Sequence, residues 1–251
     1  MYFGDTHLHT GMSMDAGAFG SRLQPEDAHR FARGEELTAS GGLKVKLSRP
    51  LDFLVVADHS DNMGFFPRLF AGDPKMLADP TGKRWYGMIQ EGGQSGMRAA
   101  VEIIQGLTQG TMPKALAVLP GTNSYRDAWM VSVNAAEKYN KPGRYTALHG
   151  YEWTSTEKGY NRHRVVIYRD GADKASMVEP YSTVRPLGSP DEKDLWKWLE
   201  AFEKKTGGDI LAIAHNGNLS NGVMFPLADT FTGKPYDRAW AEQRIKWEPL
   251  Y

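Results

Sequence analysis

The chain has 251 residues, and its 30 basic and 30 acidic side chains give a formal net charge of zero at neutral pH. This length suffices for a single domain with a substantial core. The balanced charge argues against a protein that binds nucleic acid mainly through electrostatics, because such proteins carry a basic excess or stripe. The absence of cysteine excludes disulfides and thiolate-bound zinc, so any metal must be held by histidine and carboxylate. No apolar run is long enough to cross a membrane, and we expect no membrane partner.

The first predicted strand, near residues 2–9, ends in two histidines that are two positions apart. Successive side chains of a strand point to opposite faces, so His7 and His9 project from one face together with Asp5. Two converging imidazoles form half of a metal site. The alternative is a pair of surface or hydrogen-bonded histidines without a metal.

Three later segments also place a metal-binding type of residue at the end of an apolar strand. Residues 51–57 lead into Asp58 and His59, residues 145–151 into Glu152, and residues 209–214 into His215 and Asn216. In parallel α/β folds, functional side chains gather where short apolar strands end. The pattern predicts an α/β barrel with a cluster of ligands at one end.

A fifth segment, residues 163–169, carries its histidine at the start of the predicted strand. If this strand runs antiparallel to its neighbours, or bends over the barrel mouth, His163 reaches the same pocket. The alternative is a histidine at an ordinary strand edge.

The rest of the chain predicts helices over residues 25–36, 127–139 and 191–205, and a short strand or hairpin piece over residues 44–47. Residues 61–124 are too long for an ordinary connection between strand and helix, and we expect an inserted, lid-like segment there. Its aromatic side chains, among them Phe65, Phe66 and Trp85, either wall a substrate pocket or pack the insertion onto the barrel.

The order of these motifs resembles the polymerase and histidinol phosphatase (PHP) superfamily of metal-dependent phosphoesterases. Residues 4–10, 151–154 and 161–164 resemble more narrowly its poorly characterised DUF3604 branch. The resemblance covers nearly the whole chain. It implies one domain over residues 1–251, a distorted (β/α)7 barrel with two or three Mn, Zn or Fe ions at the C-terminal ends of its strands.

Carried over residue by residue, the resemblance implies a ligand set of histidines and carboxylates. The set comprises His7, His9, Asp15, His59, Glu152, His163 and His215. Glu152 would bridge two ions with its two oxygens. Asp5 and Asp58 would orient imidazoles from behind, with direct ligation by either as the alternative.

The chain lacks the late Asp-x-His motif of the superfamily, because no histidine follows His215. We therefore expect a fragment whose barrel is incomplete at the C-terminus. No signal peptide precedes the first strand, and the native compartment stays open, because an upstream segment can have been trimmed.

The expected function is hydrolysis of phosphate monoesters or diesters. Clustered cations would lower the pKa of a shared water, giving hydroxide at physiological pH, and would neutralise the oxygens of a tetrahedral ester. The expected catalytic residues are Glu152, His59 and His215. Arg162, Arg164 and Asn216 are candidates to bind a small-molecule ester, although surface charge is the alternative for the arginines.

Two alternatives stay open. Sulfate or phosphonate esters suit the same site, and a non-catalytic metal-binding domain would keep the ligands without turnover. A serine hydrolase is disfavoured, because the chain lacks a Gly-x-Ser-x-Gly elbow and its histidines are better explained as ligands.

Overall fold

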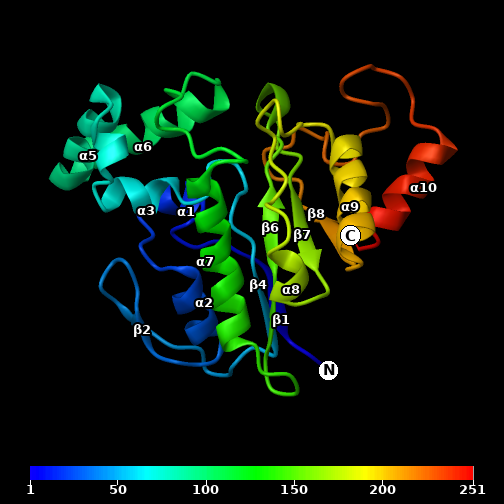
Figure 1. Cartoon of the computed structure of the whole chain (residues 1–251), viewed down its shortest axis with the longest axis horizontal. Coiled ribbons are helices and arrows are strands. Elements are labelled where there is room, and N and C mark those ends of the chain that lie inside the picture. Colours follow the sequence, from blue (N-terminus) through cyan, green and yellow to red (C-terminus); the bar gives the residue numbers. More distant parts are fainter. Residues whose placement is uncertain (251) are drawn as a thin grey trace.

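The strands that carry the predicted motifs form two connected sheets, with helices around them (Figure 1). The structure is a computed structural model that describes residues 1–250. In the first sheet, β1 (Gly4–Leu8), β4 (Phe53–Val56) and β5 (Thr146–Leu148) pair in parallel, in the order β1-β4-β5. In the second sheet, β6 (Gly150–Trp153), β7 (Arg164–Tyr168) and β8 (Ile210–Ala214) pair in an antiparallel manner, in that order. A separate antiparallel pair consists of β2 (Leu37–Thr38) and β3 (Lys44–Val45).

The two sheets are connected because the chain passes directly from β5 to β6, with only His149 between them. The backbone N–H of Glu152 donates to the Asp58 carbonyl at 3.0 Å, and that of Ser60 donates to the Glu152 carbonyl at 2.8 Å. These bonds continue the parallel pairing beyond the end of β4. They place the segment that carries His59 directly beside Glu152.

Alternate side chains of β4 pack on opposite faces of the sheet, as the pleat of a strand requires. Leu54 and Val56 pack with α2 (Pro25–Ala32) and α7 (Asn123–Tyr139). Val55 contributes to a separate cluster with Val165 and Ile167 of β7. Glu152 is the register partner of Val165 and therefore lies on the face of that second cluster.

The largest core cluster joins the second sheet to the helices. Tyr151 and Tyr168 pack against Trp129 of α7, with ring centroids 6.1 and 5.8 Å away, and Tyr168 also meets Phe202 of α9 (Glu192–Thr206) at 5.1 Å. Asp191 caps the N-terminus of α9, and its side chain accepts from the backbone N–H of Lys193.

Residues 61–124 fold mainly into helices that lie at one corner of the molecule (Figure 1). These helices are α3 (Phe65–Phe70), α4 (Pro74–Leu77), α5 (Pro80–Glu91) and α6 (Gly93–Thr108). Phe65, Phe66 and Trp85 are at most 4% exposed and belong to the largest core cluster. Of the two alternatives for these aromatic side chains, packing of the segment onto the core is therefore the one observed.

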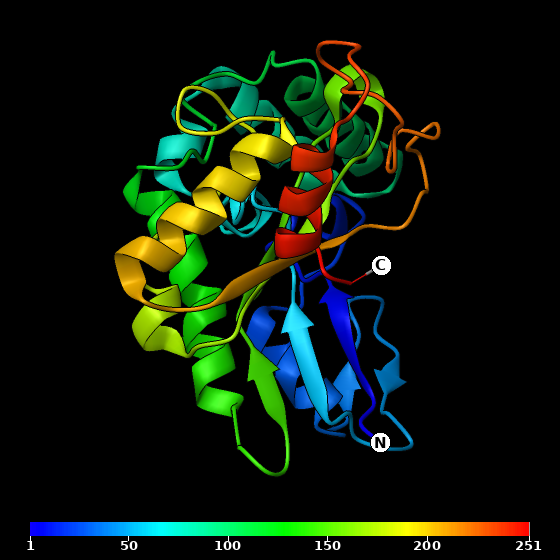
Figure 2. The same cartoon turned by 90° about the vertical axis from the view of Figure 1, so that its right-hand side faces the viewer.

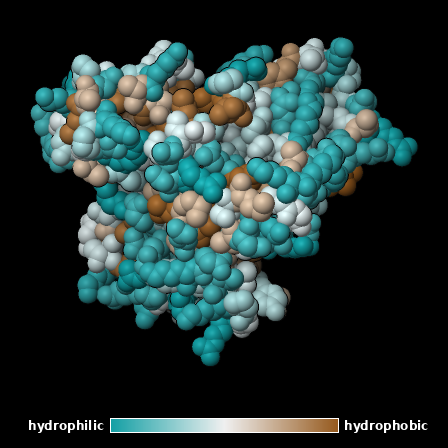
Figure 3. Space-filling view, viewed as in Figure 1, coloured by the Kyte–Doolittle hydropathy of each residue, from teal (hydrophilic) through white to brown (hydrophobic). Residues whose placement is uncertain are grey.

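The remaining helices are α1 (Met14–Ala18), α8 (Ala172–Ala175) and α10 (Arg238–Trp247), with a short 3-10 turn at Glu157–Gly159. None of these three helices was expected from the sequence. No helix within residues 1–250 is long and apolar enough to cross a membrane. The face shown in Figure 3 is mostly hydrophilic, with apolar side chains gathered over the region of α5 and α6.

The prediction of a (β/α)7 barrel is wrong. Within residues 1–250, β1 pairs only with β4, and β8 pairs with β7 apart from a single bridge between Ile213 and Leu250, so the strands do not close. In addition, β7 runs antiparallel to both of its neighbours, whereas a barrel of this kind needs parallel strands. Figure 2 shows β1, β4 and β5 side by side below α9 and α10.

Candidate metal centre

The structure brings the predicted ligands together where the two sheets meet. His7 lies in β1 and His9 just after it, Asp15 lies in α1, His59 follows β4, Glu152 lies in β6, His163 precedes β7 and His215 follows β8. Each side chain thus stands on or beside an end of regular structure, and several distant segments contribute to one cluster.

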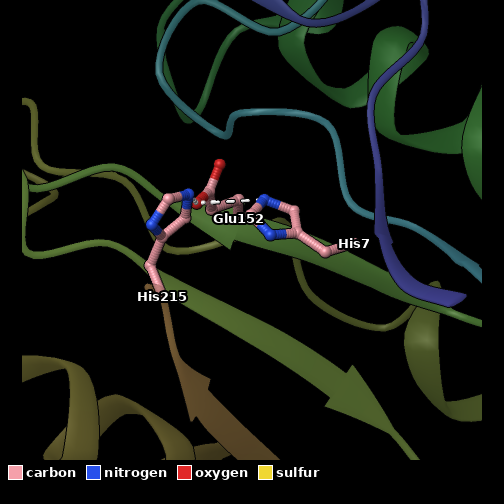
Figure 4. Close-up of side chains that lie close together, drawn as sticks. All are labelled: His7, Glu152 and His215. Carbon is pink, nitrogen blue, oxygen red and sulfur yellow. Dashed lines mark ion pairs between the residues drawn. The ribbon is translucent and has the colours of Figure 1, made fainter. Parts of the chain in front are cut away.

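Glu152 is the centre of this cluster and is fully buried. Its Oε1 lies 3.3 Å from Nε2 of His7 and 3.6 Å from Nε2 of His215 (Figure 4). Its Oε2 lies 3.1 Å from Nε2 of His9 and 3.1 Å from Nδ1 of His59. The two oxygens of one carboxylate therefore face two different pairs of imidazoles.

Asp15 forms a second group with His9 and His59. Its Oδ2 lies 2.9 Å from Nδ1 of His9 and 3.7 Å from Nε2 of His59. Within this group, and within the group of His7, Glu152 and His215, the possible ligand atoms lie within 4.8 Å of one another. The structure thus contains two adjacent groups of possible metal ligands, and Glu152 contacts residues of both.

His163 lies between His59 and His215, with ring centroids 5.3 and 5.5 Å away. It is outside both three-residue groups. Burial lowers its pKa to about 3, and the nearby imidazoles add to this effect against the opposing charge of Glu152. Its ring is therefore neutral at physiological pH, which is the form that binds a metal.

Charge within the cluster is set by close contacts that outweigh burial. Burial opposes the charged form of His9, but its contacts with Asp15 and Glu152 raise the pKa to about 10. Burial likewise opposes ionisation of the two carboxyl groups, yet the facing imidazoles hold the pKa of Asp15 and that of Glu152 well below the usual range. Both carboxylates are therefore ionised at neutral pH.

The donor set fits divalent ions, and His215 gives the clearest test. Its Nδ1 lies 2.9 Å from the carbonyl oxygen of Asn216, which can only accept, so Nδ1 carries the proton. In the neutral ring, Nε2 then presents a lone pair to the ionised Oε1 of Glu152 at 3.6 Å. A cation or a proton between these two electron-rich atoms would turn their repulsion into attraction. Imidazole and carboxylate are donors that Mn, Fe and Zn accept.

Asp5 and Asp58 hold backbone rather than imidazoles. Oδ1 of Asp5 accepts from the backbone N–H of His7 at 2.8 Å. The carboxylate of Asp58 accepts from the backbone N–H of Thr10 at 2.5 Å and from its hydroxyl at 2.8 Å, and burial raises the pKa of Asp58 to about 6. Asp5 and Asp58 therefore do not orient imidazoles, as the resemblance implied, but hold the backbone of the segment that carries His7 and His9.

Arg162 and Arg164 are buried instead of lying at the surface or facing a substrate. Nη1 of Arg162 lies 2.7 Å from Oε2 of Glu192, and Nε of Arg164 lies 2.8 Å from Oε1 of Glu248. Because each guanidinium already balances a buried carboxylate, we do not retain either as an anion-binding residue. Asn216 is exposed next to His215, where its Oδ1 accepts from the backbone N–H of Asn218 at 3.0 Å.

Two hydroxyl side chains of the site were not expected from the sequence. Oγ of Ser13 donates to Oδ1 of Asp15 at 2.7 Å and accepts from the backbone N–H of His59 at 3.1 Å. Oγ1 of Thr154 lies 2.8 Å from Nδ1 of His59. The available signal was spacing, because each hydroxyl is two residues from a predicted carboxylate ligand.

A family model described as a protein of unknown function (DUF3604) matches residues 1–251. No curated protein and no solved structure matches the chain.

Proposed function

Because the chain belongs to the DUF3604 family, which is described only as a protein of unknown function, we propose a function from its own side chains: metal-dependent hydrolysis of phosphate esters. The observation that carries the proposal is the position of Glu152, whose two oxygens face two different pairs of imidazoles. A carboxylate placed in this way can bridge two cations.

Divalent ions held there would lower the pKa of a water molecule and neutralise the oxygens of a tetrahedral ester. The residues that would hold them are those of the two groups, His7, Glu152 and His215, and His9, Asp15 and His59. The neutral ring of His163 would add a further nitrogen donor at the edge of the cluster.

The approach to the site is set by exposure. Asp15 and His7 are the most open ligands, with 42% and 27% of their side chains exposed, whereas Glu152 is fully buried. An ester would therefore reach the cluster from the side of Asp15 and His7. Asn216, which is also exposed, stays a candidate for contact with the ester.

We propose on the same ground that the DUF3604 chain is related to the PHP superfamily. Support comes from the order of the motifs and from the convergence of the candidate ligands. The fold adds no support, because the open sheets do not form a barrel that could be compared. The preference for phosphate over sulfate esters rests on this resemblance alone. The substrate test must therefore include phosphate esters and sulfate esters.

The test combines metal content with turnover. The chain, purified with Mn, Zn or Fe supplied, should hold about two ions, one for each group, and should hydrolyse aryl phosphate monoesters or diesters faster than aryl sulfates. Glu152→Gln keeps the shape of the side chain but removes its charge. We expect this variant to lose metal affinity and activity by more than the ~10–100-fold that is typical when a residue behind a metal ligand is substituted.

Glu137→Gln is the matched control, because Glu137 faces His149 at 3.7 Å outside the cluster. It should leave metal content and turnover unchanged. A parent chain that takes up no metal would overturn the metal site. Two bound ions without turnover of any ester would overturn the hydrolase and leave a metal-binding domain.

A further inference from the structure

Thr154 lies two residues after Glu152, with its hydroxyl against His59. Oγ1 of Thr154 donates to the backbone carbonyl oxygen of Glu152 at 2.9 Å and lies 2.8 Å from Nδ1 of His59. A hydroxyl has one proton to donate. Since that proton goes to the carbonyl oxygen, Oγ1 must accept from His59, which requires a proton on Nδ1.

The carboxylate of Glu152 gives independent support. Its Oε2 lies 3.1 Å from the same Nδ1 of His59. A carboxyl oxygen accepts hydrogen bonds, so an N–H on Nδ1 would be attracted to it, whereas a lone pair on Nδ1 would be repelled. Both neighbours of Nδ1 therefore favour the same tautomer, and in the neutral ring the lone pair lies on Nε2. That atom faces Oδ2 of Asp15 at 3.7 Å, a longer approach than the 2.8 and 3.1 Å contacts at Nδ1, so the two closer neighbours decide the tautomer.

We propose that Thr154 is a positioning residue, which holds His59 in its Nδ1–H form so that Nε2 is presented to an ion bound by His9, Asp15 and His59. The inference rests on the proposed metal site for its purpose. The tautomer itself is a property of the metal-free chain. Partners that orient a ligating histidine contribute about 10–100-fold to metal affinity.

The experiment compares Thr154→Val, which keeps the shape but removes the hydroxyl, with Thr154→Ser, which keeps the hydroxyl. Ser155→Ala is the matched control, because the Ser155 hydroxyl donates to the carbonyl of Pro190 at 2.8 Å and not to a ligand. The tautomer of His59 is read by long-range nitrogen–proton NMR of the metal-free chain at mildly alkaline pH. Affinity for Zn²⁺ is measured by calorimetric titration.

The parent, Thr154→Ser and Ser155→Ala should show His59 protonated at Nδ1. In Thr154→Val, the population of the other tautomer should rise, and one of the two Zn²⁺ ions should bind about 10-fold or more weakly. The proposal is overturned if the parent shows His59 protonated at Nε2, or if Thr154→Val matches the parent in both tautomer and affinity. Absence of Zn²⁺ binding in the parent, with the expected tautomers, would instead overturn the proposed function alone.

A separate observation concerns a small cavity at the bend between β5 and β6. The cavity has a volume of about 10 Å³, and its lining includes His29, Ser132 and His149. Each contributes a buried polar atom without a hydrogen-bond partner among the described residues, namely Nε2, Oγ and Nδ1. The three residues are 0%, 7% and 4% exposed.

We infer that this cavity binds one water molecule that bridges the three side chains. Its volume suits a single water, and three hydrogen bonds are typical of a buried one. A high-resolution crystal structure should show a water within about 3.2 Å of all three atoms. The same position in Ser132→Ala should show a water with fewer contacts or no water. An empty cavity in the parent, or direct bonds among the three side chains, would overturn the inference.

Discussion

Arg164 and Glu248 form a buried ion pair that connects the start of β7 to the end of α10. Nε of Arg164 lies 2.8 Å from Oε1 of Glu248, and at most 4% of either side chain is exposed. Trp196 donates to the same oxygen at 2.9 Å. Nη1 of Arg164 also donates to the carbonyl oxygen of His163 at 3.0 Å. The pair therefore supports the backbone of a predicted metal ligand.

Removing the carboxylate by Glu248→Ala should cost about 3–5 kcal/mol of unfolding free energy, because it leaves a buried guanidinium without its counter-charge. Urea denaturation measures the change. Glu242→Ala is the control, since Glu242 pairs with Arg238 at 2.7 Å on the same helix with both side chains largely exposed. We expect that control to lie within about 0.5 kcal/mol of the parent. A similar small loss for Glu248→Ala would contradict a structural role for the pair.

The local elements could be predicted because their signals are local. The apolar run over residues 209–214 became β8 (Ile210–Ala214), and the capped, amphipathic run over residues 191–205 became α9 (Glu192–Thr206). The convergence of most candidate ligands could also be predicted, because six of the seven stand on or beside the end of a strand. Asp15 lies in α1 (Met14–Ala18) and was expected only from the family resemblance. In α10, apolar and charged residues alternate without a clear helical period, and the helix was missed.

The direction and closure of the strands, and the burial of Arg162 and Arg164, could not be predicted because they depend on partners far away in the sequence. Whether strands run parallel, and whether they close, is decided by pairing such as that of β7 with β8, for which a single sequence carries no signal. Arg162 and Arg164 look like exposed anion ligands until their partners Glu192 and Glu248, 30 and 84 residues away, are known.

The two ligand groups should lose their ions separately. His215→Ala removes a donor from the group around Oε1 of Glu152, and Asp15→Asn removes one from the group with His9 and His59. Each single variant should retain about one ion of two, and the double variant should retain none, because each site would lack one of its donors. Elemental analysis after dialysis checks this. Loss of both ions in either single variant would indicate one shared site.

His29 should make the chain less stable in acid. The ring is fully buried, and Nδ1 lies 2.8 Å from the hydroxyl of Tyr145. Burial, assisted by His149, lowers the pKa of His29 to about 4. An unfolded histidine has a pKa of about 6.5, so the unfolded state binds the proton more tightly. The stability from the neutral ring is thus present above about pH 6.5 and lost as the pH falls toward 4, by about 3 kcal/mol in all.

The measurement is urea denaturation of the parent and of His29→Gln between about pH 7 and pH 4. The variant should lose less stability than the parent over this range, because glutamine does not titrate. The neighbouring His149, whose pKa is also lowered by burial, contributes in the same direction in both proteins. An equal loss in parent and variant would show that His29 is not held neutral.

A side chain at position 150 should destabilise the fold, because Gly150 stands where the chain bends from one sheet into the other, two residues before Glu152. A Cβ there would lie 2.4 Å from Cγ1 of Val55 and 2.8 Å from the carbonyl oxygen of Val166. Gly150→Ala should therefore cost about 1–3 kcal/mol and weaken metal binding by displacing Glu152. Gly87→Ala is the control, since a Cβ on this residue of α5 meets nothing within 4 Å. This variant should raise the free energy of unfolding by up to about 1 kcal/mol, because alanine favours a helix more than glycine does. Denaturation and metal titration of both variants test the pair, and a Gly150→Ala chain that is as stable and as metal-rich as the parent would show that the bend can relax without moving the ligand.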